Sequence, residues 1–81
     1  MQVYSLMSKE VNSLHESIID ELKKIRLAKG YSHYKIAELT GLNRTAIGHI
    51  ESKKRNPTLL TCLKIAKALE VDLGEIISDI Q

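Results

Sequence analysis

Residues 33–52, HYKIAELTGLNRTAIGHIES, form the stretch that most constrains the fold of this 81-residue chain. Gly41 stands near its middle, and glycine readily adopts the positive φ that ends a helix and reverses the chain. Asn43 follows at the natural N-cap of a second helix, and Ile47 and Ile50 give that helix an apolar stripe. The stretch therefore predicts two short helices that are joined by a tight turn and pack against one another.

The composition favours helices throughout the chain. There is no Trp or Phe and there are three Tyr, so the core must be aliphatic, and one Pro with four Gly leaves little room for a turn-rich β fold. Eighty-one residues make one small domain, near the lower limit for folding without disulfides or metals. We therefore expect a compact all-α domain.

Helical spacing and capping residues predict five helices. The first is expected from Ser13, which forms a capping box with the Glu three positions later, to Gly30; its apolar stripe extends back to Met7, which leaves a start at Ser8 open. The other four are expected at 33–40, 44–53, 59–69 and 73–80, with N-caps at Ser32, Asn43, Thr58 and Asp72. Residues 1–12 are then an N-terminal extension, and residues 13–81 form the domain.

Charge is concentrated in the middle of the chain. The net charge is +2, but residues 23–67 carry +9, whereas residues 1–22 and 68–81 carry −3 and −4. A basic middle between acidic ends predicts one positive face, which is typical of a protein that binds a polyanion. A solvated surface with a local excess of lysine is the alternative. The helix pair at 33–52 argues against it, because this is the helix-turn-helix pattern, whose second helix fits the DNA major groove.

Other kinds of site find little support. Cys62 is the only cysteine, so the chain forms neither an internal disulfide nor a cysteine-based metal cluster. His15, His33 and His49 fall on three different expected helices without metal-ligand spacing. No nucleophile–base pair or glycine-rich phosphate loop occurs, so we expect no enzyme, cofactor or metal. No run is apolar enough to cross a bilayer and no signal peptide is visible, which favours a soluble cytoplasmic protein without a membrane partner.

The segments LKKIRLAKGYS and IAELTGLNRTAIGHIESKKRNPTLLTCLKIAKALEVDLGEII, over about residues 20–77, resemble the phage repressor and Cro-type (Xre-like) helix-turn-helix family. The resemblance rests on four features that occur together and in order: the Ala-Gly-Ile spacing, the I-E pair, the N-P-T cap and the I-A-x-A-L-x-V-x-L ending. It implies a five-helix fold with the helix-turn-helix at the second and third helices. It also implies binding to double-stranded DNA as a dimer, and control of transcription.

The second helix of the motif carries the expected base contacts. Because Ile47 and Ile50 point inward, helical spacing turns the opposite side outward, with Arg44, Thr45, Gly48 and His49. The resemblance implies that Arg44, Thr45 and His49 contact base edges, and Arg44 fits the O6 and N7 atoms of guanine. Gly48 either leaves room for DNA or is simply tolerated at a cost of about 1 kcal/mol, and the sequence leaves both readings open.

Phosphate contacts are expected around this helix, where they fix its register on DNA. The amide ends of the helices that begin near residues 33 and 59 favour anions, and a run of bases follows the motif. The expected set is His33, Tyr34, Lys35, Asn43, Lys53, Lys54, Asn56 and Thr58. The family usually has Gln where this chain has His33, and protonation of His33 is expected to strengthen its phosphate contact.

Two further groups have structural roles. Arg26 and Glu51 each lie on an otherwise apolar helix face, and the resemblance implies an ion pair between them that orients the recognition helix. A homodimer interface is expected on the last helix, through Leu73, Ile76, Ile77 and Ile80.

The sequence therefore predicts a sequence-specific transcriptional regulator, a repressor or a controller, that acts as a homodimer on an inverted-repeat operator. The alternative is an antitoxin-type protein that neutralises a partner protein through its N-terminal apolar residues. A fold relic without DNA activity is a third reading, against which Arg44 and the basic middle of the chain argue.

Overall fold

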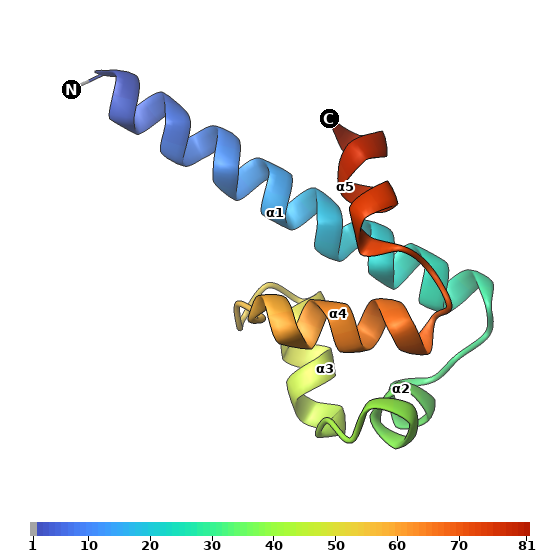
Figure 1. Ribbon diagram of the computed structural model, residues 1–81. Coiled ribbons are helices and arrows are strands. Elements are labelled where there is room, and N and C mark those ends of the chain that lie inside the picture. The colour runs from blue at the N-terminus through green and yellow to red at the C-terminus, as the bar shows by residue number, and fades with distance from the viewer. Residues whose placement is uncertain (1) are drawn as a thin grey trace.

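The computed structural model describes residues 2–81, with side chains described from Met7 onward. Five helices follow one another in the chain: α1 (Gln2–Ala28), α2 (His33–Thr40), α3 (Arg44–Glu51), α4 (Leu59–Ala68) and α5 (Leu73–Ile80). No strand occurs within the described residues, and the expected all-α fold is confirmed. Helices α2, α3 and α4 pack together beside the C-terminal half of α1, and α5 packs against both α1 and α4 (Figure 1).

The first helix is much longer than the sequence predicted. It begins at Gln2, so the expected start at Ser13 and its alternative at Ser8 are both wrong. No Gly or Pro lies between residues 2 and 28, so nothing breaks the helix, and Ser13 lies inside it instead of capping it. The N-terminal half of α1 extends beyond the other helices (Figure 1). Neither α1 nor any other helix in the described part of the chain has an apolar stretch that would span a membrane.

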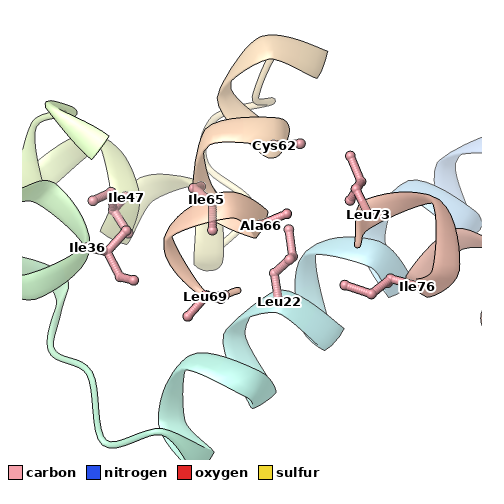
Figure 2. Close-up of a cluster of buried hydrophobic side chains, with 9 residues drawn as sticks. All are labelled: Leu22, Ile36, Ile47, Cys62, Ile65, Ala66, Leu69, Leu73 and Ile76. Carbon is pink, nitrogen blue, oxygen red and sulfur yellow. The ribbon is translucent and has the colours of Figure 1, made fainter. Parts of the chain in front are cut away.

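The core is aliphatic and draws on all five helices. One buried cluster contains Leu22, Ile36, Ile47, Cys62, Ile65, Ala66, Leu69, Leu73 and Ile76 (Figure 2). Its largest fully buried side chains are Ile36 of α2, Ile47 of α3 and Leu69 after α4. Burial of these side chains is the main source of stability in a domain of this kind, so the placement of α3 depends on the same contacts that hold the fold together.

The fifth helix gives part of its apolar face to this core. Leu73 and Ile76 are 6% and 7% exposed, because the subunit's own helices already cover them. These two side chains therefore have little exposed surface in the subunit, and a dimer interface through Leu73, Ile76, Ile77 and Ile80 stays a prediction. Ile77 and Ile80 are half-buried at the edge of the core.

Two helices end earlier than the sequence predicted. Helix α3 ends at Glu51 rather than Lys53, because Lys53 adopts a left-handed φ of 66° and the amide of Lys54 bonds back to the carbonyl of His49 at 2.9 Å. Helix α4 ends at Ala68, and Leu69 is its C-cap. The expected bounds of the helices at 33–40 and 73–80 are confirmed.

Candidate nucleic-acid interface

The turn between α2 and α3 is held by local hydrogen bonds. Gly41 has a φ of 78°, and its amide donates to the carbonyl oxygen of Ala37 at 2.8 Å. The hydroxyl of Thr40 donates to the carbonyl oxygen of Ile36 at 2.7 Å and accepts the amide of Leu42 at 3.1 Å. A side chain at Gly41 would be strained at this φ, so the glycine sets the angle at which α3 leaves α2.

Helix α3 presents one side to the core and the other to the solvent. The side-chain oxygen of Asn43 accepts the amide of Thr45 at 2.8 Å and so caps the helix. Ile47 and Ile50 are 1% and 5% exposed and anchor the inward side. The three side chains expected to contact bases are all exposed on the other side: Arg44, Thr45 and His49.

A shallow hollow lies between the start of α2 and the exposed side of α3. It is lined by Ser32, His33, Tyr34, Arg44, Thr45, Gly48 and His49. The guanidinium of Arg44 lies 5.9 Å from the ring centre of Tyr34, which is 61% exposed. A cation–π contact of this kind contributes about 0.5–1 kcal/mol at an exposed site. It holds Arg44 beside α2 while the side chain remains accessible from the solvent.

An ion pair joins α1 to the end of α3. The guanidinium of Arg26 donates from Nε to one carboxylate oxygen of Glu51 at 2.7 Å and from Nη2 to the other at 2.9 Å. Its Nη1 donates to the carbonyl oxygen of Tyr31 at 2.6 Å. The side chains of Arg26 and Glu51 are 10% and 12% exposed. The structure thus contains the contact that the family resemblance implied for these two residues.

His33 extends this ion pair to α2. Its Nε2 lies 2.8 Å from Oε1 of Glu51, the oxygen that also accepts from Arg26. An ionised carboxylate only accepts hydrogen bonds, so Nε2 carries the proton and donates. Burial raises the pKa of the Glu51 carboxyl, but hydrogen bonds and charge from Arg26 and His33 outweigh burial and hold that pKa below its usual value. Glu51 therefore links α1, α2 and α3 as a carboxylate.

His33 was expected among the phosphate contacts, and its bond to Glu51 was not predicted from the sequence. The two residues are eighteen positions apart on different helices, and no local pattern in the sequence connects them. The bond directs Nε2 inward, and a Cβ built on Gly48 would lie 3.8 Å from Nδ1 of the same ring. His33 is thus a link between the ion pair and the exposed side of α3.

Gly48 has no steric reason for being glycine within the subunit. A Cβ at this position would lie 3.7 and 3.8 Å from two ring atoms of His33, which is ordinary van der Waals contact. Alanine would therefore fit, although the helix interior favours it by about 1 kcal/mol over glycine. The fold of the subunit therefore does not require a glycine at this position.

The expected phosphate contacts surround the motif, and some already have partners. The Nζ of Lys53 pairs with the carboxylate of Asp20 on α1, and the Nζ of Lys35 lies 3.6 Å from Glu38. The hydroxyl of Thr58 accepts the amide of Thr61 at 3.1 Å as the N-cap of α4. Tyr34, Asn43, Lys54 and Asn56 are exposed. Because the ion pairs of Lys35 and Lys53 are exposed, they cost little to exchange for a phosphate.

Metal ions and reactive cysteines each require a particular arrangement of side chains, and the structure describes side chains from Met7 onward. No three His, Cys, Asp or Glu side chains among them are placed to hold a metal ion. Burial raises the pKa of the Cys62 thiol, which disfavours the reactive thiolate. Cys62 is instead part of the buried cluster.

Comparison with known proteins agrees with this geometry. The model of the helix-turn-helix family matches residues 22–76. The control protein C.SmaI of Serratia marcescens is 34% identical over 65 residues, which are 80% of this chain and 77% of that protein. The control protein C.MunI of Mycoplasma sp is 38% identical over 63 residues, which are 76% of this chain and 85% of that protein.

A third relative is a longer protein. The HTH-type transcriptional regulator SutR of Escherichia coli (strain K12) is 39% identical over 57 residues, which are 70% of this chain but 32% of that protein. No solved structure gives a significant match to the chain.

The chain belongs to the helix-turn-helix family, and the Xre-like resemblance seen in its sequence is confirmed. Its class is that of DNA-binding regulators of transcription, and the expectation that it is not an enzyme agrees with this family and these relatives.

Proposed function

We propose that this protein binds an inverted-repeat operator as a homodimer and regulates transcription there, with one α3 per subunit in the major groove. The observation that carries the proposal is the division of α3 into two sides. Ile47 and Ile50 are buried, whereas Arg44, Thr45 and His49 are exposed beside the start of α2. A helix that is held by its inner side and exposed on its outer side fits the geometry by which this motif enters the groove.

The exposed side chains have the chemistry for direct recognition of base edges. Arg44 donates two parallel hydrogen bonds to the O6 and N7 atoms of guanine, and Thr45 contacts a thymine methyl group or forms one hydrogen bond. His49 donates to a guanine or to a phosphate. Around them, the expected phosphate contacts fix the register: His33, Tyr34, Lys35, Asn43, Lys53, Lys54, Asn56 and Thr58.

A dimer supplies what one small domain lacks. One recognition helix covers few base pairs, so two helices about 34 Å apart, one turn of DNA, provide both affinity and operator length. Two of the relatives are named control proteins, and this chain aligns with most of their length. This similarity supports a role as a controller or repressor.

Selection of bound sites from random DNA tests the proposal. We expect an inverted repeat whose half-site centres lie about 10 base pairs apart, because each α3 occupies one major groove on the same face of the duplex. Recovery of a single unrepeated half-site would contradict the homodimer, and no enrichment of any site would contradict sequence-specific binding.

The exposed apolar side chains of α1 favour a second candidate function. Met7 and Val11 are 55% and 63% exposed, and an antitoxin-type protein would bind its partner through such a surface. Affinity measured against salt concentration separates the two functions. A DNA complex with many phosphate contacts weakens about a thousandfold or more between about 50 and 200 mM salt, whereas an apolar protein contact changes little.

A further inference from the structure

The N-terminal half of α1 carries an apolar stripe that the subunit covers only in part. Met7, Val11, Leu14 and Ile18 recur at spacings of four, three and four residues, which is the heptad pattern of paired helices. Ile18 packs against the core, Leu14 is half-buried, and Met7 and Val11 are exposed. In Figure 1 this part of α1 lies beyond the other four helices. A helical segment of this length is marginal in water without a packing partner.

We propose that a second copy of this chain covers this stripe, with the two α1 helices antiparallel; the proposal rests on the homodimer proposed above. Helix α5 decides the orientation. Its half-buried Ile77 and Ile80 pack at the edge of the core, as Ile18 does, and α5 lies beside the C-terminal half of α1 (Figure 1). In a parallel pair the two copies of α5 would compete for space at the same end. In an antiparallel pair they lie at opposite ends.

In one antiparallel register, every apolar residue of the stripe faces an apolar residue of the partner's stripe. This register sets Val11 against the partner's Leu14, and Met7 against the partner's Ile18. The flanking positions then meet without like charges, because Glu10 faces the partner's Ser17 and Ser8 faces the partner's His15. The remaining charged residues of this segment lie on the far side of the helix: Lys9, Glu16 and Asp20. An apolar seam with compatible flanks is what a self-complementary, two-fold interface requires.

The same register gives a spacing that suits DNA. Helix α3 contacts α1 through the ion pair of Glu51 with Arg26. Lys53, which follows α3, pairs with Asp20 of α1. The junction between α3 and α1 is therefore centred near residue 23 of α1. The symmetry centre lies midway between Val11 and Leu14. At 1.5 Å per residue, the two junctions are about 32 Å apart along the helix axis. This is close to the turn of about 34 Å that separates two half-sites.

A charge introduced into the apolar stripe tests the proposed interface. Val11→Glu places two unpaired carboxylates in the paired stripe, and we expect the dimer dissociation constant, measured by sedimentation equilibrium, to rise about a hundredfold. Val11 is 63% exposed within the subunit, so the buried core is untouched and cooperative urea unfolding, followed by circular dichroism, should be retained. Ser13→Glu is the matched control, because it adds the same charge to the exposed opposite side of α1, and we expect a change within about twofold.

Cysteine cross-linking tests the orientation. Val11→Cys and Leu14→Cys, each combined with Cys62→Ala, are mixed, allowed to exchange subunits and oxidised, and the products are identified by mass spectrometry. We expect the mixed product to dominate, because this register sets residue 11 against the partner's residue 14. Dominance of the two homodimeric products would establish a parallel pair and overturn the antiparallel arrangement.

The remaining outcomes separate this inference from the proposed function. A Val11→Glu protein that dimerises as the wild type does would overturn the α1 interface, while an inverted repeat recovered by site selection would still uphold the homodimeric regulator. A wild-type protein that remains monomeric in solution at every concentration would overturn the interface as well, and would leave the stripe to a different partner protein.

Discussion

The two sides of α3 differ in what holds them. The inner side contributes Ile47 and Ile50 to the core and ends in Glu51, which accepts hydrogen bonds from α1 and α2. The outer side carries Arg44, Thr45 and His49 in the solvent, and the cation–π contact of Arg44 with Tyr34 is a weak one.

This difference separates stability from recognition within eight residues. A change on the inner side moves the helix and weakens the fold, so its effect on DNA binding is indirect. A change on the outer side leaves the fold intact, so its effect on binding reports a direct contact. Single substitutions on each side of α3 test this division.

Glu51→Ala should have the largest effect. It leaves the guanidinium of Arg26 largely buried without its carboxylate, which costs about 3 kcal/mol in the free energy of unfolding. Urea unfolding followed by circular dichroism measures this loss. Glu38→Ala is the control, since Glu38 is exposed and pairs only loosely with Lys35, and its cost should be below about 1 kcal/mol. Equal stabilities of the two variants would contradict a structural role for Glu51.

Arg44→Ala should leave stability unchanged within about 0.5 kcal/mol and weaken operator binding by about 1–3 kcal/mol, roughly tenfold to a hundredfold. Site selection with this variant should relax the preference at one symmetric pair of positions. Lys54→Ala is the comparison, because loss of a phosphate contact should weaken binding to all sequences alike and lower the salt dependence. A uniform loss for both variants would assign Arg44 to the phosphate backbone.

Gly48→Ala should change stability and DNA binding in opposite directions. The methyl group makes ordinary contact with His33, so we expect the free energy of unfolding to rise by about 1 kcal/mol from helix propensity. We also expect weaker DNA binding, because the exposed side of α3 then approaches the duplex less closely. An unchanged affinity would show that the glycine is merely tolerated and leaves no room for DNA.

The contacts of Glu51 with Arg26 and His33 should also make stability depend on pH, with a smaller effect. The pKa of Glu51 lies below its usual value of 4.5 in the folded protein. Its carboxylate therefore stabilises the fold fully above about pH 4.5, and this contribution is lost as the pH falls through the lowered pKa. Thermal melts of wild type and Glu51→Gln across this range should converge toward acid pH. A constant difference between them would show that the charge of Glu51 does not contribute.

The helix-turn-helix was predictable because its signals act over a few residues. Ser32, Asn43, Thr58 and Asp72 each accept an amide within the first turn of the helix that follows, and Gly41 adopts its positive φ at the expected place. The exposed position of Arg44, Thr45 and His49 followed from the period of the helix, once Ile47 and Ile50 were assigned to the core. The pair of Arg26 and Glu51 was implied by the family resemblance rather than by spacing.

Rules based on neighbouring residues gave the wrong start for α1 and the wrong end for α3. The capping box at Ser13 suggested a helix start, yet the helix continues through it, because the residues before it are also compatible with a helix. Lys53 ends α3 in a left-handed conformation that non-glycine residues seldom adopt. The bonds from the amides of Lys53 and Lys54 to α3 carbonyls support that conformation, and the identity of Lys53 gave no sign of it.

The sequence by itself determined the order of the helices, the turn between α2 and α3, and the side of α3 that faces outward, because capping and helical periodicity operate between near neighbours. Only the tertiary structure decided that His33 donates to Glu51, that Leu73 and Ile76 belong to the subunit's own core, and that the N-terminal half of α1 extends beyond the other helices. These outcomes depend on which distant surfaces meet, and side chains that are far apart in the chain compete for the same partners until packing selects among them.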